Sequence, residues 1–227
     1  MKKLGLIGGT SWHSTIEYYR NINQMVEAML PQPPKNPELL LYSINVDLMR
    51  RNNWTEIENY YLTISNTLIN AGAEAIIICA NTPHKVYDFV QPKIDVPILH
   101  IADAIGKECV RLGVKTVGQM GTIQVTEEDF ISKPLREKYD VETLQATAEM
   151  RQQMDWLIKN ELTRGIFTEN SVNYFKTVMN HHAENGAQAM ILGCTEIPIL
   201  LRDIKYNLPL IDTTMLHSKL AADFIVG

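Results

Sequence analysis

The sequence lacks the features that several large classes of protein need. Its 21 lysines and arginines are outnumbered by 26 aspartates and glutamates, and it contains no basic run, which argues against nucleic acid and anionic membranes as partners. Its longest apolar runs, such as AIIICA, are far shorter than the roughly 20 residues of a membrane-spanning helix. A strand pattern begins at once, with no secretory leader pattern before it, so we expect a cytoplasmic protein.

Cysteine is scarce and ungrouped. The three cysteines, Cys79, Cys109 and Cys194, show no CxxC spacing and no metal-site grouping, so we expect reduced thiols and no metal centre. Cys79 falls in a predicted strand and Cys109 on a predicted helix, where an inert core residue is the usual outcome. The sequence also has neither GxGxxG nor GxxxxGK[ST], which leaves no motif for a nucleotide.

What the sequence has is a regular alternation of strands and helices, which predicts an α/β fold with parallel sheets. The spacing of Ser14 and Glu17, and of Thr126 and Asp129, predicts helices that begin at Ser14 and Thr126 with capping boxes. The proline-rich segment 31–37 is expected to be a surface loop. The predicted strands are 3–9, 38–45, 73–80, 96–101, 115–122, 141–147, 187–194 and 208–213.

The second half of the chain repeats the first. Gly5 and Gly8 recur 113 residues later, Gly72 and Ala73 recur 114 residues later, and Pro97 recurs 112 residues later, at Pro209. Three nearly equal offsets indicate an internal duplication, which predicts two pseudo-symmetric parallel-sheet α/β lobes with the active site in the cleft between them. We place the first lobe at 1–104 plus 212–227 and the second at 105–211.

The turns that follow the predicted strands are the candidate binding segments, because ligands of open parallel sheets bind at the carboxyl ends of the strands. These turns are rich in glycine, serine, threonine and asparagine and poor in lysine and arginine. Backbone N–H groups and hydroxyls at the start of a helix suit a carboxylate. The segments are 8–14, 80–84, 121–126, 193–196 and 212–214.

Cys194 is the strongest candidate for a catalytic residue. It ends a buried strand, follows Gly193 and precedes Thr195 and Glu196. A cysteine near backbone N–H groups at the mouth of a cleft is expected to have a lowered pKa, and its thiolate would be a good base or nucleophile. Two matching strand ends on opposite sides of one substrate carbon would suit the transfer of a proton from one face to the other, which is racemisation.

The motifs GLIGGTSWHSTIEYY, CANTPHKV, GT…T, GCTEI and LIDTT occur in order along the chain. Together they resemble the aspartate/glutamate racemase superfamily, in its amino-acid racemase branch that includes aspartate racemase. The resemblance implies two α/β lobes, an active site between them, no metal or pyridoxal cofactor and a frequent homodimer. It also implies a pair of cysteines that act as acid and base on either side of Cα.

Carried over by motif, the second catalytic cysteine is Cys194, whereas the first position holds Ala80, which has no proton to give. Thr82 is a possible replacement, and a distorted strand end could bring in Cys79. Thr163 stands where aspartate-specific relatives carry a lysine, which puts specificity for a dicarboxylic amino acid in doubt. The expected substrate-binding residues are Gly9, Thr10, Ser11, Arg50, Asn81, Thr82, Thr122, Thr126, Thr195 and Glu196.

Three functions remain open from the sequence. The first is a cofactor-independent racemase or epimerase of a small, aspartate- or glutamate-like amino acid. The second is a single-cysteine decarboxylase of malonate type, because one thiol can protonate a planar carbanion from one side. The third is a catalytically impaired paralogue that binds amino acids. In each reading the partner is a small amino acid or carboxylate.

Overall fold

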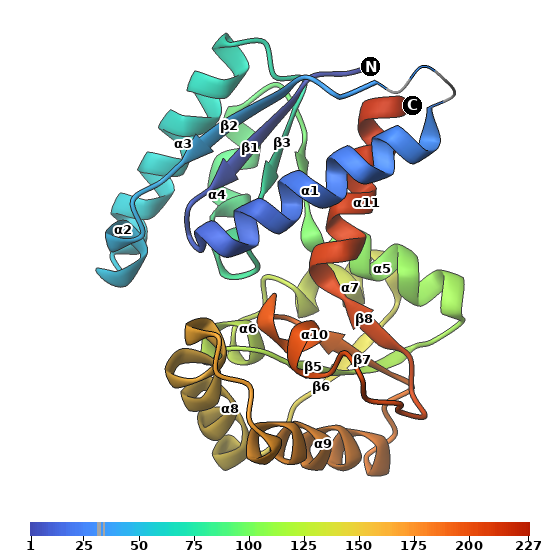
Figure 1. Ribbon diagram of the computed structural model, residues 1–227. Coiled ribbons are helices and arrows are strands. Elements are labelled where there is room, and N and C mark those ends of the chain that lie inside the picture. Colours follow the sequence, from blue (N-terminus) through green and yellow to red (C-terminus); the bar gives the residue numbers. More distant parts are fainter. Residues whose placement is uncertain (31–32, 34) are drawn as a thin grey trace. The chain divides into compact units, whose positions relative to one another are not determined.

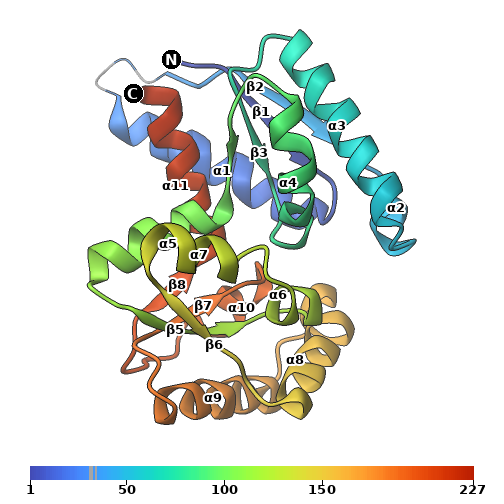
Figure 2. The same ribbon diagram turned by 180° about the vertical axis from the view of Figure 1, so that it is seen from behind.

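The computed structural model describes residues 1–30, 33 and 35–227, which form two compact units, each built on its own four-stranded parallel sheet (Figure 1, Figure 2). Unit 1 contains Met1–Ile101 and Thr214–Gly227, and unit 2 contains Ala102–Thr213. The predicted α/β class with two parallel-sheet lobes is confirmed. The predicted limits, 1–104 with 212–227 and 105–211, stay a prediction about separately folding domains.

Unit 1 carries the sheet with strand order β2-β1-β3-β4, in which every pairing is parallel. Helices α1 and α11 cover one face of this sheet, and α3 and α4 cover the other (Figure 1). Its strands are β1 (Leu4–Gly8), β2 (Leu39–Ser43), β3 (Ala75–Ile78) and β4 (Ile98–Leu99). Its helices are α1 (Trp12–Met29), α2 (Asp47–Arg50), α3 (Trp54–Asn70), η1 (Thr82–Val86), α4 (Tyr87–Val90), η2 (Gln91–Lys93) and α11 (Thr213–Val226).

The two faces of this sheet hold separate apolar cores because side chains alternate along a strand. Ile77 and Cys79 face α1 and α11, where they pack with Tyr18. Ile76 and Ile78 face α3, where they pack with buried side chains of that helix. The residue that follows Cys79 is therefore expected on the α3 side.

Unit 2 carries the sheet with order β6-β5-β7-β8, again wholly parallel. Buried side chains of α8 and α9 pack on one face of it, against Met120, Met190 and Leu192. Its strands are β5 (Thr116–Met120), β6 (Glu142–Leu144), β7 (Ala189–Leu192) and β8 (Leu210–Asp212). Its helices are α5 (Ile101–Leu112), α6 (Ile123–Glu127), α7 (Ser132–Tyr139), α8 (Ala148–Asn160), η3 (Leu162–Arg164), α9 (Glu169–Glu184) and α10 (Glu196–Leu200).

The duplication is visible in the backbone hydrogen bonds. Ile76 N–H donates to the Pro97 carbonyl at 2.9 Å, and Met190 N–H donates to the Pro209 carbonyl at 2.9 Å. The loops before these strands also match, because Gly72 and its counterpart at 186 both adopt a positive φ, +97° and +95°. The left-handed conformation after a helix favours glycine, which explains why glycine recurs at this spacing.

Several predicted helix limits were wrong. Helix α1 begins at Trp12 with Ser11 as its N-cap, because the Ser11 hydroxyl accepts the Ser14 N–H; the capping box at Ser14 does not form. The helix expected from Thr126 is two helices, α6 and α7, of which α6 already starts at Ile123. The predicted loop 31–37 falls partly on 31, 32 and 34, outside the described residues. No helix in the described part is both long and apolar enough to cross a membrane.

Candidate active site

Ala80 and Cys194 occupy equivalent places at the ends of β3 and β7. Cys79 N–H donates to the Ile7 carbonyl at 2.9 Å, and Gly193 N–H donates to the Met120 carbonyl at 2.8 Å, so each backbone leaves its sheet through the same hydrogen bond. Cys79 is thus the counterpart of Gly193, and the next residues, Ala80 and Cys194, correspond. The two copies differ in the side chain that ends the strand.

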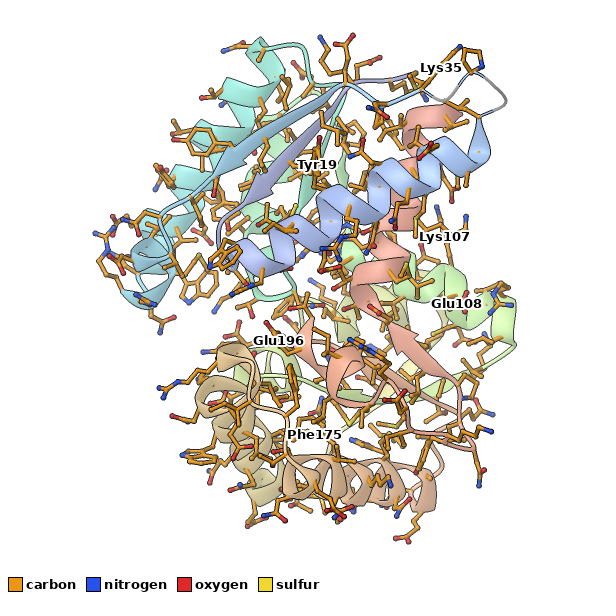
Figure 3. The ribbon with its side chains drawn as sticks, in the orientation of Figure 1. Tyr19, Lys35, Lys107, Glu108, Phe175 and Glu196 are labelled. Carbon is orange, nitrogen blue, oxygen red and sulfur yellow. The ribbon has the colours of Figure 1, made fainter. Side chains whose placement is uncertain are left out.

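The Cys194 thiol belongs to a hydrogen-bonded group of three residues. It is half-buried, and its Sγ donates to Glu196 Oε2 at 2.9 Å. Thr195 Oγ1 donates to the same oxygen at 2.7 Å. Glu196 is the first residue of α10, where Figure 3 marks it. The turn is close-packed, because a Cβ on Gly193 would lie 2.8 Å from the Met120 carbonyl oxygen.

The prediction of a lowered pKa for Cys194 was wrong. Burial raises the pKa of the thiol well above its usual value, and the negative charge of Glu196 raises it further. The backbone N–H groups of Thr195 and Glu196 act in the opposite direction but are outweighed. At rest the residue is a protonated thiol whose hydrogen is directed at a carboxylate.

Two threonines after β5 differ in what their hydroxyls can offer. Thr122 is the N-cap residue of α6, but its side chain makes no capping bond, and its buried Oγ1 has no hydrogen-bond partner among the described residues. Thr126 Oγ1 donates to the carbonyls of Thr122 and Ile123, both at 3.2 Å. The Thr122 hydroxyl is therefore left without a partner in the described part of the protein, whereas the Thr126 hydrogen is used inside the helix.

The loop after β1 is fixed by close contacts. Gly9 has φ +93°, and a Cβ on it would lie 2.4 Å from the Ile44 carbonyl oxygen, so only glycine fits. Its N–H donates to Thr15 Oγ1 at 3.0 Å. Thr10 and Ser11 follow at the start of α1, both half-buried. The loop therefore holds a hydroxyl, Thr10, beside the N-terminus of an 18-residue helix.

The turn after β3 is held by His84. Its Nδ1 lies 2.9 Å from the Ala80 carbonyl oxygen and 3.1 Å from that of Asn81, and since a carbonyl oxygen only accepts, Nδ1 carries the hydrogen. His84 therefore has a structural role in this turn. Asn81 is buried, and Thr82, half-buried, opens η1. Ala80 itself supplies no proton.

The other two cysteines lie in the apolar core. The Cys79 side chain is 1% exposed within the core beneath α1 and α11, and burial raises its pKa. Its carbonyl accepts the Ser14 hydroxyl at 2.9 Å, which fixes the backbone at this point. Cys109 is 0% exposed and its pKa is raised to about 11, mainly by burial. The predicted inert core role holds for both.

Arg50 lies on the surface of α2, where it pairs with Asp47 Oδ1 at 3.0 Å across one helical turn.

The sequence pattern also missed two residues. Tyr61 was passed over although its hydroxyl reaches Thr10 at the strand end, since a tyrosine on the apolar side of a helix is normally core. His182 lies in the last turn of α9, a place that usually leaves a histidine in solvent, but its side chain is fully buried. Within the described ranges, no group of three or more His, Cys, Asp and Glu side chains could hold a metal ion.

Comparison with known proteins gives consistent matches. The family profile described as Asp/Glu/Hydantoin racemase matches residues 7–221. The structure titled a putative Asp/Glu racemase from Yersinia pestis is 36% identical, with full coverage of both chains and a TM-score of 0.94. An aspartate racemase homologue from Pyrococcus horikoshii is 30% identical, again with full coverage of both, and has a TM-score of 0.87. Glutamate racemase from Francisella tularensis, in complex with D-glutamate, shares the fold at 17% identity and TM-score 0.69, covering 99% of this chain and 81% of that one.

Proposed function

Because this chain belongs to the Asp/Glu/hydantoin racemase family, we propose that it is a cofactor-independent racemase or epimerase of a small, aspartate- or glutamate-like amino acid. The observation that carries the proposal is the Cys194 thiol at the end of β7, hydrogen-bonded to Glu196. A thiol in this place has both a proton to deliver and a neighbour that can take one.

Cys194 would work in either direction. As an acid, the thiol transfers its hydrogen to the planar carbanion, so that the S–H bond breaks and a Cα–H bond forms. As a base, it first passes its hydrogen across 2.9 Å to Glu196 Oε2, and the resulting thiolate then removes the hydrogen from Cα. The Thr195 hydroxyl, which donates to the same carboxylate oxygen, stabilises the charge on Glu196 while that carboxylate is ionised.

Neutral hydrogen-bond donors would bind the α-carboxylate of the substrate. Backbone N–H groups and hydroxyls suit an α-carboxylate, and the unpartnered Thr122 hydroxyl is the strongest single candidate. Arg50 would have to exchange Asp47 for a side-chain carboxylate of the substrate. The proposed binding set is Gly9, Thr10, Ser11, Arg50, Asn81, Thr82, Thr122, Thr126, Thr195 and Glu196.

The group that acts from the side of Ala80 is the least defined part of the proposal. Ala80 has no proton and Cys79 faces the core, so the proposed stand-in is the Thr82 hydroxyl. That one substrate is shared by both units stays a prediction. So do a homodimer, which light scattering would test, and a cytoplasmic location.

The test is to incubate the protein with single enantiomers of amino acids in deuterated water, starting with L- and D-aspartate and L- and D-glutamate. The expected result is inversion of configuration with incorporation of deuterium at Cα. Chiral chromatography would detect the inversion and mass spectrometry the deuterium. Cys194→Ser should abolish it, whereas the buried Cys109→Ser, with the same atom exchange, should not. No exchange with any amino acid would refute the proposal.

The lone functional thiol gives one observation in favour of a second activity. A decarboxylase of a malonate derivative needs one proton delivered to one face of a carbanion, which Cys194 could supply without a partner at Ala80. Release of carbon dioxide from an alkyl or aryl malonate, lost in Cys194→Ser, would support it. Binding of an amino acid without turnover, unaffected by that substitution, would instead support a non-catalytic paralogue.

A further inference from the structure

The Tyr61 hydroxyl is buried near the end of the sheet in unit 1. Tyr61 lies on α3, is 1% exposed and packs on the face of the sheet that carries Ile76 and Ile78. Its hydroxyl is 3.4 Å from Thr10 Oγ1, its one hydrogen-bond partner among the described residues. A buried phenol oxygen without a partner is costly, and this contact, long for a hydrogen bond between hydroxyls, is the one that satisfies it.

The direction of this hydrogen bond follows from the chemistry of the two hydroxyls. A phenol is a better donor than an aliphatic alcohol, and burial raises the pKa of Tyr61 above its usual value, so it stays protonated. A threonine hydroxyl has one hydrogen and two acceptor sites. If Tyr61 donates to Thr10 Oγ1, the Thr10 hydrogen is left for another acceptor, and no described residue accepts it.

Thr10 stands where a carboxylate is expected. The pairing of Ile7 with Ile78 brings the loop after β1 alongside the turn that contains Ala80. Thr10 is half-buried and lies two residues before the first residue of α1, whose early N–H groups favour an anion. Gly9, with φ +93° and no room for a Cβ, fixes the backbone just before it.

We propose that Tyr61 is a positioning residue: its hydroxyl holds the Thr10 hydroxyl as a hydrogen-bond donor to a carboxylate oxygen of the amino-acid substrate. This assignment rests on the proposed function. It adds a residue that would be taken for an ordinary core residue from its position on α3 alone. The Tyr61 hydroxyl acts through Thr10 and transfers no proton to the substrate.

The chain offers a matched control on the same helix. Tyr60 pairs its hydroxyl with the Tyr42 hydroxyl at 3.2 Å, so Tyr60→Phe removes the same atom from a similar bond. We would measure the dissociation constant of L-aspartate by equilibrium dialysis, and KM and kcat by chiral chromatography. We expect Tyr61→Phe to raise the dissociation constant and KM about 3- to 10-fold with kcat changed less than twofold, and Tyr60→Phe to change neither.

A second variant keeps the test valid if Tyr61→Phe is poorly folded, which circular dichroism would show. Thr10→Val removes the donor and should weaken L-aspartate binding about 10- to 100-fold, the usual effect of losing a hydrogen bond to a charged group. The double variant, Thr10→Val with Tyr61→Phe, should bind no more weakly than Thr10→Val alone, because Tyr61 acts only through Thr10.

Three results would overturn the assignment while leaving the proposed function intact. They are equal binding by Tyr61→Phe and Tyr60→Phe, additive losses in the double variant, and a fall in kcat with unchanged binding, which would make Tyr61 part of proton transfer. A wild-type protein that neither binds nor exchanges any amino acid would overturn the proposed function, and this assignment with it.

Discussion

Acidification should destabilise unit 2 through His182, a side chain outside the candidate site. His182 is fully buried on α9. Its ring packs on β5, where a Cβ on Gly118 would lie 2.6 Å from His182 Cγ. Burial, with a smaller contribution from His181, lowers the pKa of His182 from 6.5 to about 4.

The sign and size of the effect follow from proton linkage. The lowered pKa means that the unfolded chain binds a proton more readily, so this contribution is complete above pH 6.5 and is lost as the pH falls toward 4. The full difference corresponds to about 3 kcal/mol, and the part lost between pH 7.5 and pH 5 is about 2 kcal/mol. Other buried groups also titrate, so the test compares variants rather than absolute stabilities.

Urea unfolding followed by circular dichroism at pH 7.5 and pH 5 measures this contribution. His182→Phe keeps an aromatic ring and removes the titration, so its stability should fall about 2 kcal/mol less than that of the wild type over this interval. His13→Phe, at an exposed position on α1, should behave as the wild type does. Equal losses in the wild type and His182→Phe would refute the reasoning.

Three further predictions concern the two strand ends. Glu196→Gln removes the nearby negative charge, so the pKa of Cys194 should fall and alkylation by iodoacetamide should proceed at lower pH, while turnover drops because the proton acceptor is gone; an unchanged alkylation profile would contradict this. Ala80→Cys should increase inversion relative to one-sided deuterium exchange, read by chiral chromatography and mass spectrometry; a fall in that ratio would count against a role for this position. Gly9→Ala should lower the unfolding free energy in urea by about 2 kcal/mol or more, because its Cβ would lie 2.4 Å from the Ile44 carbonyl oxygen; an unchanged midpoint would show that the loop adapts.

The sequence predicted the fold well because backbone requirements leave a mark on residue type. Gly72 recurs in the second half since a helix end in the left-handed conformation needs glycine. Pro97 and Pro209 stand at matching places, since the carbonyl of each accepts an N–H from the neighbouring strand, but this bond does not itself require proline. Helix limits were predicted less well: Ser11 and Ser14 are both plausible caps, and only the contacts of the folded loop decide between them.

The place of Cys194 in the fold was predicted from the sequence, but its electrostatics were not. Cys194 does end its strand beside Thr195 and Glu196, as the motif indicated. Its pKa moves upward rather than downward mainly because the thiol is buried, and further because the Glu196 carboxylate lies beside it; neither the burial nor the rotamer of Glu196 is encoded in the spacing of the residues. Tyr61 could not be identified from the sequence, because its hydroxyl is a single polar atom on a side of α3 that carries mainly apolar residues, such as Ile57 and Ile64.

The two strand ends are held by different kinds of hydrogen bond. The turn at Ala80 is held by its own carbonyl, which accepts His84 Nδ1, and by the Cys79 carbonyl, which accepts the Ser14 hydroxyl. None of these bonds involves the side chain at position 80. In unit 2, by contrast, the side chains of Cys194 and Thr195 both bond to Glu196. The first strand end therefore does not depend on the side chain at position 80 for its shape, whereas the thiol of the second strand end is part of a side-chain hydrogen-bond group, so a substitution should disturb the local structure less at Ala80 than at Cys194.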